Sequence, residues 1–123
     1  MENLSTGELT LEASEDAAKR AIVLMWRGKS NARNPSQVLQ PYFSTVLAAA
    51  TSRSLGVELD FSSLEHFNSS TITSIIQLIQ ESRSKSVRLS IVYDARVKWQ
   101  KLSFDALRVF AKPDGLLELR TLG

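Results

Sequence analysis

The sequence contains no cysteine and a single histidine, His66. Disulfides, thiol catalysis, cysteine-based zinc sites and iron–sulfur clusters are therefore excluded, and a chain without cysteine is typical of a reducing compartment. Carboxylates are the remaining candidate metal ligands, and no two of them stand at a spacing typical of a metal site. We expect a cytoplasmic protein that binds no metal ion and no other cofactor.

Glycine is also scarce, and its five residues are scattered over positions 7, 28, 56, 115 and 123. No glycine-rich loop is present to bind a nucleotide phosphate. The sequence also has no large excess of charge of one sign, because it contains 15 Lys and Arg residues and 13 Asp and Glu residues. Such a balance lacks the basic field that attracts nucleic acid, so we expect no nucleic-acid partner.

Long apolar runs are absent. The run nearest the N-terminus, residues 21–26, is too short for a spanning helix, and five carboxylates in the first twenty residues argue against a signal peptide. We therefore expect neither export nor a membrane partner. The 123 residues fit a single domain, 1–123, because no linker or low-complexity stretch interrupts them.

Hydrophobic periodicity predicts the element order ββαβαβαβ. Residues 8–12 alternate as a strand that we place at a sheet edge, and the apolar run within residues 20–27 is typical of a strand covered on both faces. The expected fold is α/β, with a mixed sheet of about five strands, helices packed against it, and an antiparallel opening hairpin. The other expected strands are 57–61, 87–93 and 117–119, and helices are expected over 35–50, 69–85 and 99–110.

The ends of the first helix carry their own signals. Asn34 followed by Pro35 is typical of an N-cap and first helical residue, and Gly56 is the expected stop. Pro41 predicts a kink or a delayed start, because proline has no N–H to donate. Among the aromatic residues, we expect Trp26, Phe61 and Tyr93 to lie in the core.

His66 lies near Asp60 and Ser62 in the sequence, so a Ser-His-Asp hydrolase is one interpretation. The sequence has no Gly-x-Ser-x-Gly elbow. It also has no glycine between Gly56 and Gly115 that could form a strained nucleophile turn. We therefore interpret His66 as an exposed loop residue and expect no enzymatic activity, with a small hydrolase as the rival hypothesis.

Small polar residues, Asn68, Ser69, Ser70 and Thr71, stand between the third expected strand and the isoleucine-rich second helix. Unpaired N–H groups and the positive end of the helix dipole make such a helix start favourable for a phosphate, either bound or covalently attached. Asn and Ser are also the preferred N-cap residues, which gives the cluster a structural explanation as well.

With its element order and these residues, the sequence resembles the STAS domain. Anti-sigma-factor antagonists of this kind carry Asp-Ser-Ser-Gly-Leu-Gly at the same helix start, and a partner kinase phosphorylates the first serine, which Ser69 matches. The sequence is also similar to the SiaC-type regulatory phosphoproteins, whose motif reads Leu-Asn-Thr-Ser-Ser-Ile and whose fourth strand ends in Tyr-Asp. Residues 67–72 and the pair Tyr93-Asp94 look like these two features.

The resemblance implies a non-enzymatic regulatory phosphoprotein of a partner-switching pathway. In the SiaC-type family, the unmodified form binds and activates a diguanylate cyclase, a serine kinase of the anti-sigma type phosphorylates the switch residue, and a phosphatase reverses this step. Ser69 is the implied phosphoacceptor, with Ser70 and Thr71 as alternatives. An anti-sigma-factor antagonist, and a STAS-like scaffold that is never modified, are the alternative functions.

The partner surface is expected around Ser69, at the edge of the sheet where parallel strands end. We place in it the loop 62–67, the first turn of the second helix and the start of the third helix near Arg96. His66 and Phe67 can supply an aromatic anchor, and Arg96 can pair with a partner carboxylate or with the phosphate on Ser69. Alternatively, Phe67 packs against the helix start as a hydrophobic staple.

Overall fold

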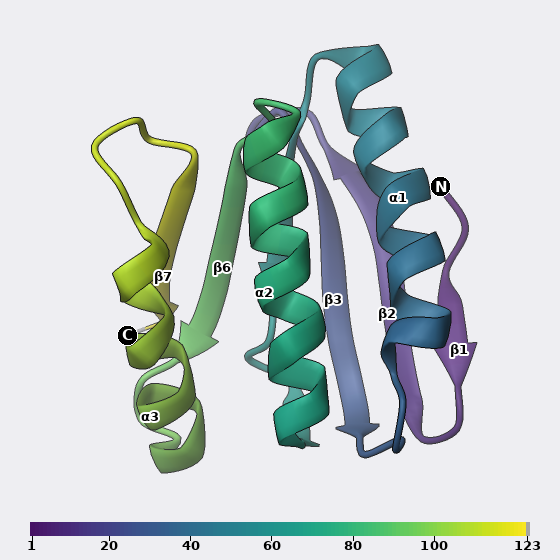
Figure 1. The fold of residues 1–123 in the computed structure, drawn as a ribbon, viewed down its shortest axis with the longest axis vertical. Coiled ribbons are helices and arrows are strands. Elements are labelled where there is room, and N and C mark those ends of the chain that lie inside the picture. Colours follow the sequence, from purple (N-terminus) through teal and green to yellow (C-terminus); the bar gives the residue numbers. More distant parts are fainter. Residues whose placement is uncertain (123) are drawn as a thin grey trace.

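Seven strands form one mixed sheet in residues 1–122, which are the residues that the computed structural model describes (Figure 1). The strands are β1 (Leu4–Thr6), β2 (Leu9–Asp16), β3 (Ala21–Ser30), β4 (Gly56–Asp60), β5 (Leu64–Phe67), β6 (Leu89–Asp94) and β7 (Leu117–Leu122). The helices are α1 (Ser36–Arg53), α2 (Ser69–Ser84), α3 (Lys98–Ala106) and the short 3-10 helix η1 (Leu107–Phe110).

The strands lie in the order β1-β2-β3-β4-β6-β7, and β5 pairs with β3 beyond the end of β4. The hairpin β2–β3 is antiparallel, whereas β3, β4, β6 and β7 run parallel to their neighbours. The predicted α/β fold is therefore confirmed, with more strands than the sequence suggested. The strand at residues 8–12 is not an edge strand, because β1 pairs with its outer side.

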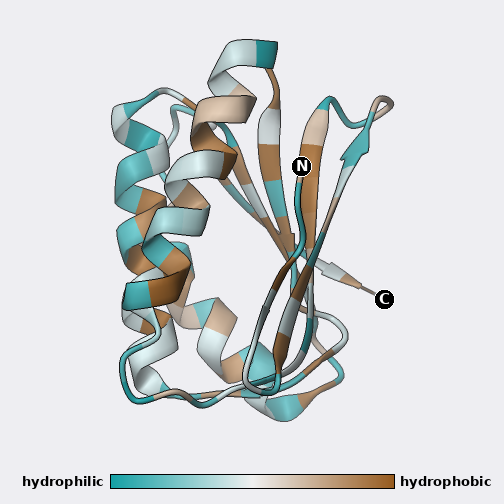
Figure 2. Ribbon diagram, turned by 90° about the vertical axis from the view of Figure 1, so that its right-hand side faces the viewer, coloured by the Kyte–Doolittle hydropathy of each residue, from teal (hydrophilic) through white to brown (hydrophobic). Residues whose placement is uncertain are grey.

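The helices cover only one face of the sheet (Figure 2). Leu24 and Trp26 of β3 are fully buried beneath them, while Val23 and Met25 point to the opposite, open face and are half-buried. The expectation that this strand is covered on both faces is therefore wrong. An apolar run can also arise where hydrophobic residues lie on the partly shielded open side of a central strand.

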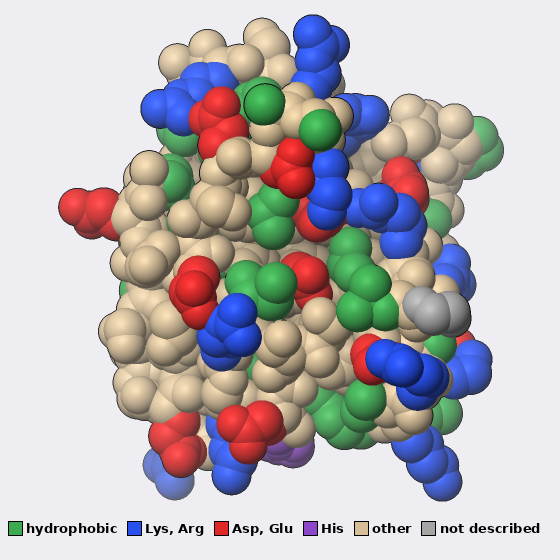
Figure 3. Space-filling model, turned by 180° about the vertical axis from the view of Figure 1, so that it is seen from behind, with side chains coloured by type: hydrophobic (Ala, Val, Ile, Leu, Met, Phe, Trp, Pro, Cys, Tyr) green, Lys and Arg blue, Asp and Glu red, His purple; other side chains and the backbone are tan. Residues whose placement is uncertain are grey.

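Charged side chains of both signs lie across this open face (Figure 3). Glu58 of β4 is buried there, with only 2% of its surface exposed. Lys19, from the turn between β2 and β3, places its Nζ 3.0 Å from Glu58 Oε2, and Arg120 of β7 pairs with the other carboxylate oxygen. These two cations compensate the cost of burying a carboxylate.

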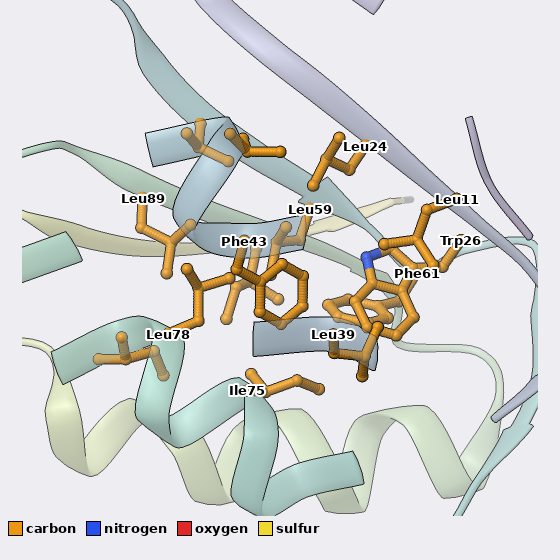
Figure 4. Packing of buried hydrophobic residues seen from close by; sticks show 14 of the residues in the cluster. Leu11, Leu24, Trp26, Leu39, Phe43, Leu59, Phe61, Ile75, Leu78 and Leu89 are labelled. Atoms are coloured by element: carbon orange, nitrogen blue, oxygen red, sulfur yellow. The ribbon is translucent and has the colours of Figure 1, made fainter. Parts of the chain in front are cut away.

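Aromatic and aliphatic side chains fill the space between the sheet and the helices (Figure 4). Trp26 and Phe61 approach to 4.6 Å between ring centroids, and Phe61 and Phe104 approach to the same distance. Tyr93 is also fully buried, so the prediction that Trp26, Phe61 and Tyr93 belong to the core is confirmed. No helix within residues 1–122 is long and apolar enough to cross a bilayer.

The ends of α1 differ from the expectation by a few residues. The helix begins at Ser36 with Pro35 as its N-cap, and no side chain caps it, so Asn34 does not act as the N-cap. It continues through Pro41 rather than starting late. Ser54, at φ 55°, takes the left-handed position that ends the helix, whereas Gly56 is the first residue of β4.

Helix α2 provides a test of this packing. Ile75 is fully buried whereas Ile76 is only partly buried against the core. We expect Ile75→Ala to lower the free energy of unfolding by about 2 to 5 kcal/mol, and Ile76→Ala to lower it less, because a buried cavity costs more than a surface one. Urea unfolding of both variants measures this difference, and equal losses would contradict the orientation of α2.

Candidate functional site

The parallel strands β3, β4 and β6 end at one edge of the sheet, where α1, α2 and α3 all begin (Figure 1). Strand β5 carries the chain from β4 along the end of β3, with Ser30 opposite Phe67. The start of α2 is therefore held directly beside the last residue of β3. This placement brings the polar cluster of residues 68–71 to the edge at which α/β folds usually bind their ligands.

Asn68 is the N-cap of α2. Its side-chain Oδ1 accepts hydrogen bonds from the backbone N of Thr71 at 3.0 Å and from Thr71 Oγ1 at 2.9 Å. Its Nδ2 donates to the carbonyl of Ala32 at 2.8 Å, and its backbone N donates to the carbonyl of Ser30 at 3.0 Å. Asn68 thus caps the helix and ties it to the segment after β3, which confirms the structural interpretation of this residue.

Thr71 is fully buried beneath the helix start. Its Oγ1 lies 2.6 Å from Ser30 Oγ and 3.2 Å from the Ser30 carbonyl oxygen. A threonine hydroxyl has one proton, so it donates to the Ser30 carbonyl or to Asn68 Oδ1 while Ser30 Oγ donates to it. This network occupies the Thr71 hydroxyl, and a kinase could reach it only after α2 had left the sheet.

Ser69 and Ser70 have different surroundings. Ser69 is the first residue of α2 and is exposed, and its hydroxyl forms no hydrogen bond to any residue of the described chain. Ser70 is half-buried, and its carbonyl accepts a hydrogen bond from Ser74 Oγ. Of the hydroxyl groups at this helix start, Ser69 is the most accessible to another protein.

Strand β5, which precedes α2, contacts the start of α3, so His66 lies in a strand and not in the loop that the sequence suggested. The ring of Trp99 lies 5.1 Å from that of Phe67 and 6.3 Å from that of His66, measured between centroids. Gln100 Nε2 donates to the carbonyl of Phe61 at 2.9 Å, while Gln100 Oε1 accepts from the backbone N of Asp94 at 2.8 Å. These contacts confirm the prediction that the segments after the third and fourth expected strands lie side by side.

The three residues expected to form the partner surface differ in exposure. His66 is exposed, but Phe67 is only 6% exposed and packs against Phe104 at 5.4 Å between centroids. Phe67 therefore supports the surface from below, and the half-buried Trp99 presents the aromatic edge beside His66. The sequence interpretation overlooked this role for Trp99, because its position fits the apolar face of a helix equally well.

Arg96 is exposed and forms a bidentate pair with Asp94. Its Nε lies 3.0 Å from Asp94 Oδ1, and its NH2 lies 3.0 Å from Oδ2. The hydrogen bonds from Arg96 lower the pKa of the Asp94 carboxyl from its ordinary value. Arg96 forms no hydrogen bond or ion pair with α2 in residues 1–122, so Asp94 is its partner in this structure.

Tyr93, the other member of the expected Tyr-Asp pair, holds α3 and η1 in place. Its hydroxyl donates to Asp105 Oδ1 at 2.5 Å and accepts from Arg108 NH2 at 2.8 Å. Hydrogen bonds from Lys101 and Tyr93 lower the pKa of the Asp105 carboxyl to about 2. Tyr93 and Asp94 thus position α3 and the loop that precedes it.

Within residues 1–122, His66 forms no hydrogen bond to a serine or a carboxylate, so no hydrolytic triad is assembled among them. Asp60 Oδ1 instead accepts hydrogen bonds from the backbone N and the hydroxyl of Ser62, at 2.9 and 2.6 Å. Among residues 1–122, no group of three histidines and carboxylates is placed to hold a metal ion. The arrangement offers an exposed hydroxyl and an aromatic rim rather than an activated nucleophile.

A hollow of about 80 Å³ lies beside the site, between the β1–β2 turn and the start of α1. Residues 30–32 line it, and Asn68 donates hydrogen bonds to the carbonyls of two of them, Ser30 and Ala32. Val38, which is 39% exposed, contributes an apolar wall. The surface around Ser69 therefore continues from the α3 side across α2 to this hollow.

No protein-family model and no curated protein matches the sequence. A chain in the crystal structure of diguanylate cyclase SiaD in complex with its activator SiaC from Pseudomonas aeruginosa is similar, with a TM-score of 0.64, 17% identity and coverage of 99% of this chain and 100% of that one. An uncharacterized protein from the DUF3478 family with a SpoIIAA-like fold, from Shewanella loihica PV-4, has a TM-score of 0.58, 14% identity and coverage of 97% and 90%. The Bacillus cell fate determinant SpoIIAA in its phosphorylated form has a TM-score of 0.54, 9% identity and coverage of 89% of both chains.

The chain has a SpoIIAA-like, STAS-type fold. The resemblance stated from the sequence is therefore confirmed for the fold. At identities of 17% and below, the similarity shows the fold alone.

The capping geometry predicts different effects for two neighbouring residues. Asn68→Ala removes the side chain that caps α2, and we expect a loss of about 0.5 to 2 kcal/mol in the free energy of unfolding. Ser69→Ala should change this free energy by less than about 0.5 kcal/mol, because the hydroxyl has no partner in the fold. Urea unfolding of both variants measures the contrast, and a larger loss for Ser69→Ala would make Ser69 a structural residue.

Proposed function

We propose that this chain is a regulatory phosphoprotein of a partner-switching pathway and that Ser69 is its phosphorylated switch residue. The observation that carries the proposal is the position of Ser69, exposed at the start of α2 and free of hydrogen bonds to the described residues. Similarity in fold to a chain in the crystal structure of the diguanylate cyclase SiaD with its activator SiaC, and to a phosphorylated SpoIIAA, supports it. We propose no catalytic activity for the chain itself.

The helix start can accept the modification. A kinase transfers the terminal phosphoryl group of ATP to Ser69 Oγ, which loses its proton, and releases ADP. Capping by Asn68 uses the backbone N–H of Thr71 and leaves those of Ser69 and Ser70 without acceptors in the described chain. These donors and the positive end of the helix dipole can stabilise a phosphate of about two negative charges, so the fold survives while the surface changes.

The unmodified surface is the proposed binding state. It combines Ser69 with exposed His66, the edge of Trp99 and the guanidinium of Arg96. A partner with an apolar or acidic contact surface fits it, and the added phosphate repels that partner. Following the SiaC resemblance, we propose a diguanylate cyclase as the partner that the unmodified form activates.

The cycle needs two further proteins. A serine kinase of the anti-sigma type adds the phosphate, and a phosphatase removes it and restores binding. Because the kinase uses ATP, we propose that the cycle operates in the cytoplasm. Similarity to phosphorylated SpoIIAA favours one second candidate, an anti-sigma-factor antagonist whose unmodified form binds an anti-sigma kinase instead of a cyclase.

Phosphorylation of Ser69 can be tested directly. After incubation with ATP and a serine kinase of the anti-sigma type, we expect one added phosphate, located on Ser69 by fragment mass spectrometry. Ser69→Ala should take up none and should still bind the cyclase. Ser69→Asp should bind it more weakly than the wild type but less weakly than the phosphorylated protein, because one carboxylate carries about half the charge of a phosphate. Ser70→Ala is the matched control and should be phosphorylated as the wild type is.

The outcomes separate the functions. Phosphate on another residue would contradict the assignment of Ser69 as the switch. A partner affinity that neither Ser69→Asp nor phosphorylation changes would favour an unmodified scaffold. Binding to the anti-sigma kinase but not to the cyclase would favour the antagonist. Ester hydrolysis that disappears in His66→Ala would favour the hydrolase.

The proposed partner surface predicts an effect at Arg96. We expect Arg96→Glu to weaken partner binding by roughly tenfold, because it replaces an exposed cation with a charge that repels an acidic partner. The fold should survive, since exposed ion pairs contribute little to stability. Isothermal titration calorimetry measures the affinity, with Lys112→Glu, an exposed residue after η1, as the charge-matched control. If Arg96→Glu leaves both affinity and the effect of phosphorylation unchanged, the partner binds elsewhere.

A further inference from the structure

Strand β7 is an edge strand of the sheet, and no strand within residues 1–122 pairs with its outer side. The backbone N of Leu89 donates to the carbonyl of Leu116 at 2.9 Å, and Leu89 is opposite Leu117 in the register. Backbone groups alternate in direction along a strand. Residues 116, 118, 120 and 122 therefore bond to β6, and residues 117, 119 and 121 direct their N–H and C=O groups to the free edge.

We propose that two copies of this chain associate through antiparallel pairing of their β7 strands, with a two-fold axis at Leu119. Leu119 then exchanges hydrogen bonds with Leu119 of the second copy, and Leu117 does so with Thr121 of the second copy. All the outward-pointing backbone groups of both strands are satisfied by this pairing. The result is a closed, isologous dimer in which the two sheets form one continuous sheet.

The charges on β7 select this register. In it, Glu118 lies opposite Arg120 of the second copy, and the symmetry repeats the pair. Both pairs occupy positions that do not exchange hydrogen bonds, where opposite side chains come closest. A shift by two residues in one direction places Glu118 against Glu118, and in the other direction Arg120 against Arg120. Only the proposed register brings opposite charges together twice.

The existing contacts of these residues permit the pairing. Arg120 reaches the buried Glu58 with its NH2 group, while its Nε lies 3.4 Å from Glu118 of its own strand. The side chain of Glu118 is 61% exposed, so it is free to contact the second copy. Lys19 also pairs with Glu58. Arg120 can therefore interact both with Glu58 of its own copy and with Glu118 of the second copy.

Apolar residues flank the ion pairs in the same register. Leu122, which is 40% exposed, faces Leu116 of the second copy on the open side of the sheet. On the helix side, α3 and η1 lie over this end of the sheet (Figure 1) and carry Leu102 and Val109, which are 65% and 78% exposed. These are the most exposed large apolar side chains of the described residues. A second copy would cover a sheet edge whose unpaired backbone groups could otherwise pair with strands of unrelated chains.

Sedimentation velocity over a concentration series tests the proposal. We expect the wild type to approach twice the 13.7 kDa chain mass as its concentration rises. Glu118→Arg should raise the dissociation constant of the dimer by roughly tenfold or more, because it turns two attractive pairs into repulsive ones. Glu65→Arg, an exposed residue of β5 with the same change of charge, is the control and should leave the constant unchanged.

A backbone variant keeps the test independent of charge. Thr121→Pro removes an N–H that points to the free edge and leaves the ladder to β6 intact, so a folded monomer is expected. Hydrogen exchange adds a local measurement, since the amides of Leu117, Leu119 and Thr121 should become protected in the wild type as its concentration rises. The proposal would be overturned by a wild type that stays monomeric, or by a dimer whose dissociation constant neither variant changes. It would also be overturned if the exchange rates of these amides do not depend on protein concentration.

Discussion

The hydrogen bond between the hydroxyls of Ser30 and Thr71, at 2.6 Å, joins the last residue of β3 to the first turn of α2. Both side chains are buried, so neither hydroxyl can exchange this contact for water without separating the helix from the sheet. Asn68 completes the junction by bonding to Thr71 on one side and to the segment after β3 on the other. The position of the whole helix start follows from this junction.

The junction also determines which hydroxyl faces the solvent. Because Asn68 caps α2 and Thr71 points inward, Ser69 occupies the first helical position on the outer side. A phosphate at Ser69 meets unpaired N–H groups and breaks no contact, whereas a phosphate at Thr71 would force a charged group into the core. The proposed switch therefore alters the chemistry of a surface and leaves the fold unchanged.

The sequence predicted the features that depend on strong periodicity or on local capping chemistry. The isoleucines of α2 and the Asn68 N-cap are of this kind, as is the meeting of the loops at the ends of β4 and β6. Strands β1 and β5 were not predicted, because three and four residues are too few for a period to emerge. Ser54 was missed as the end of α1 because a left-handed serine leaves no signal comparable to glycine.

The candidate site was predictable in its position but less so in its side chains. A short motif locates Ser69, yet the burial of Phe67 depends on Phe104 and Trp99, which lie more than thirty residues away. Arg96 pairs with Asp94, the last residue of β6, because the turn after this strand brings the two side chains together, and the periodicity of the sequence does not encode the shape of that turn. Long-range packing thus decides which of the expected contact residues reach the surface.

The two proposed surfaces lie on different parts of the molecule. Ser69 lies where α2 begins, whereas the free side of β7 is the outer edge of the sheet, with α3 between them (Figure 1). A dimer through β7 would therefore leave both copies of Ser69 accessible to a kinase and to a partner. If the partner itself carries two binding sites, the dimer would bind it with a raised effective concentration, and one phosphate would remove half of the contacts. Self-association would then sharpen the response to phosphorylation without any change in the fold around Ser69.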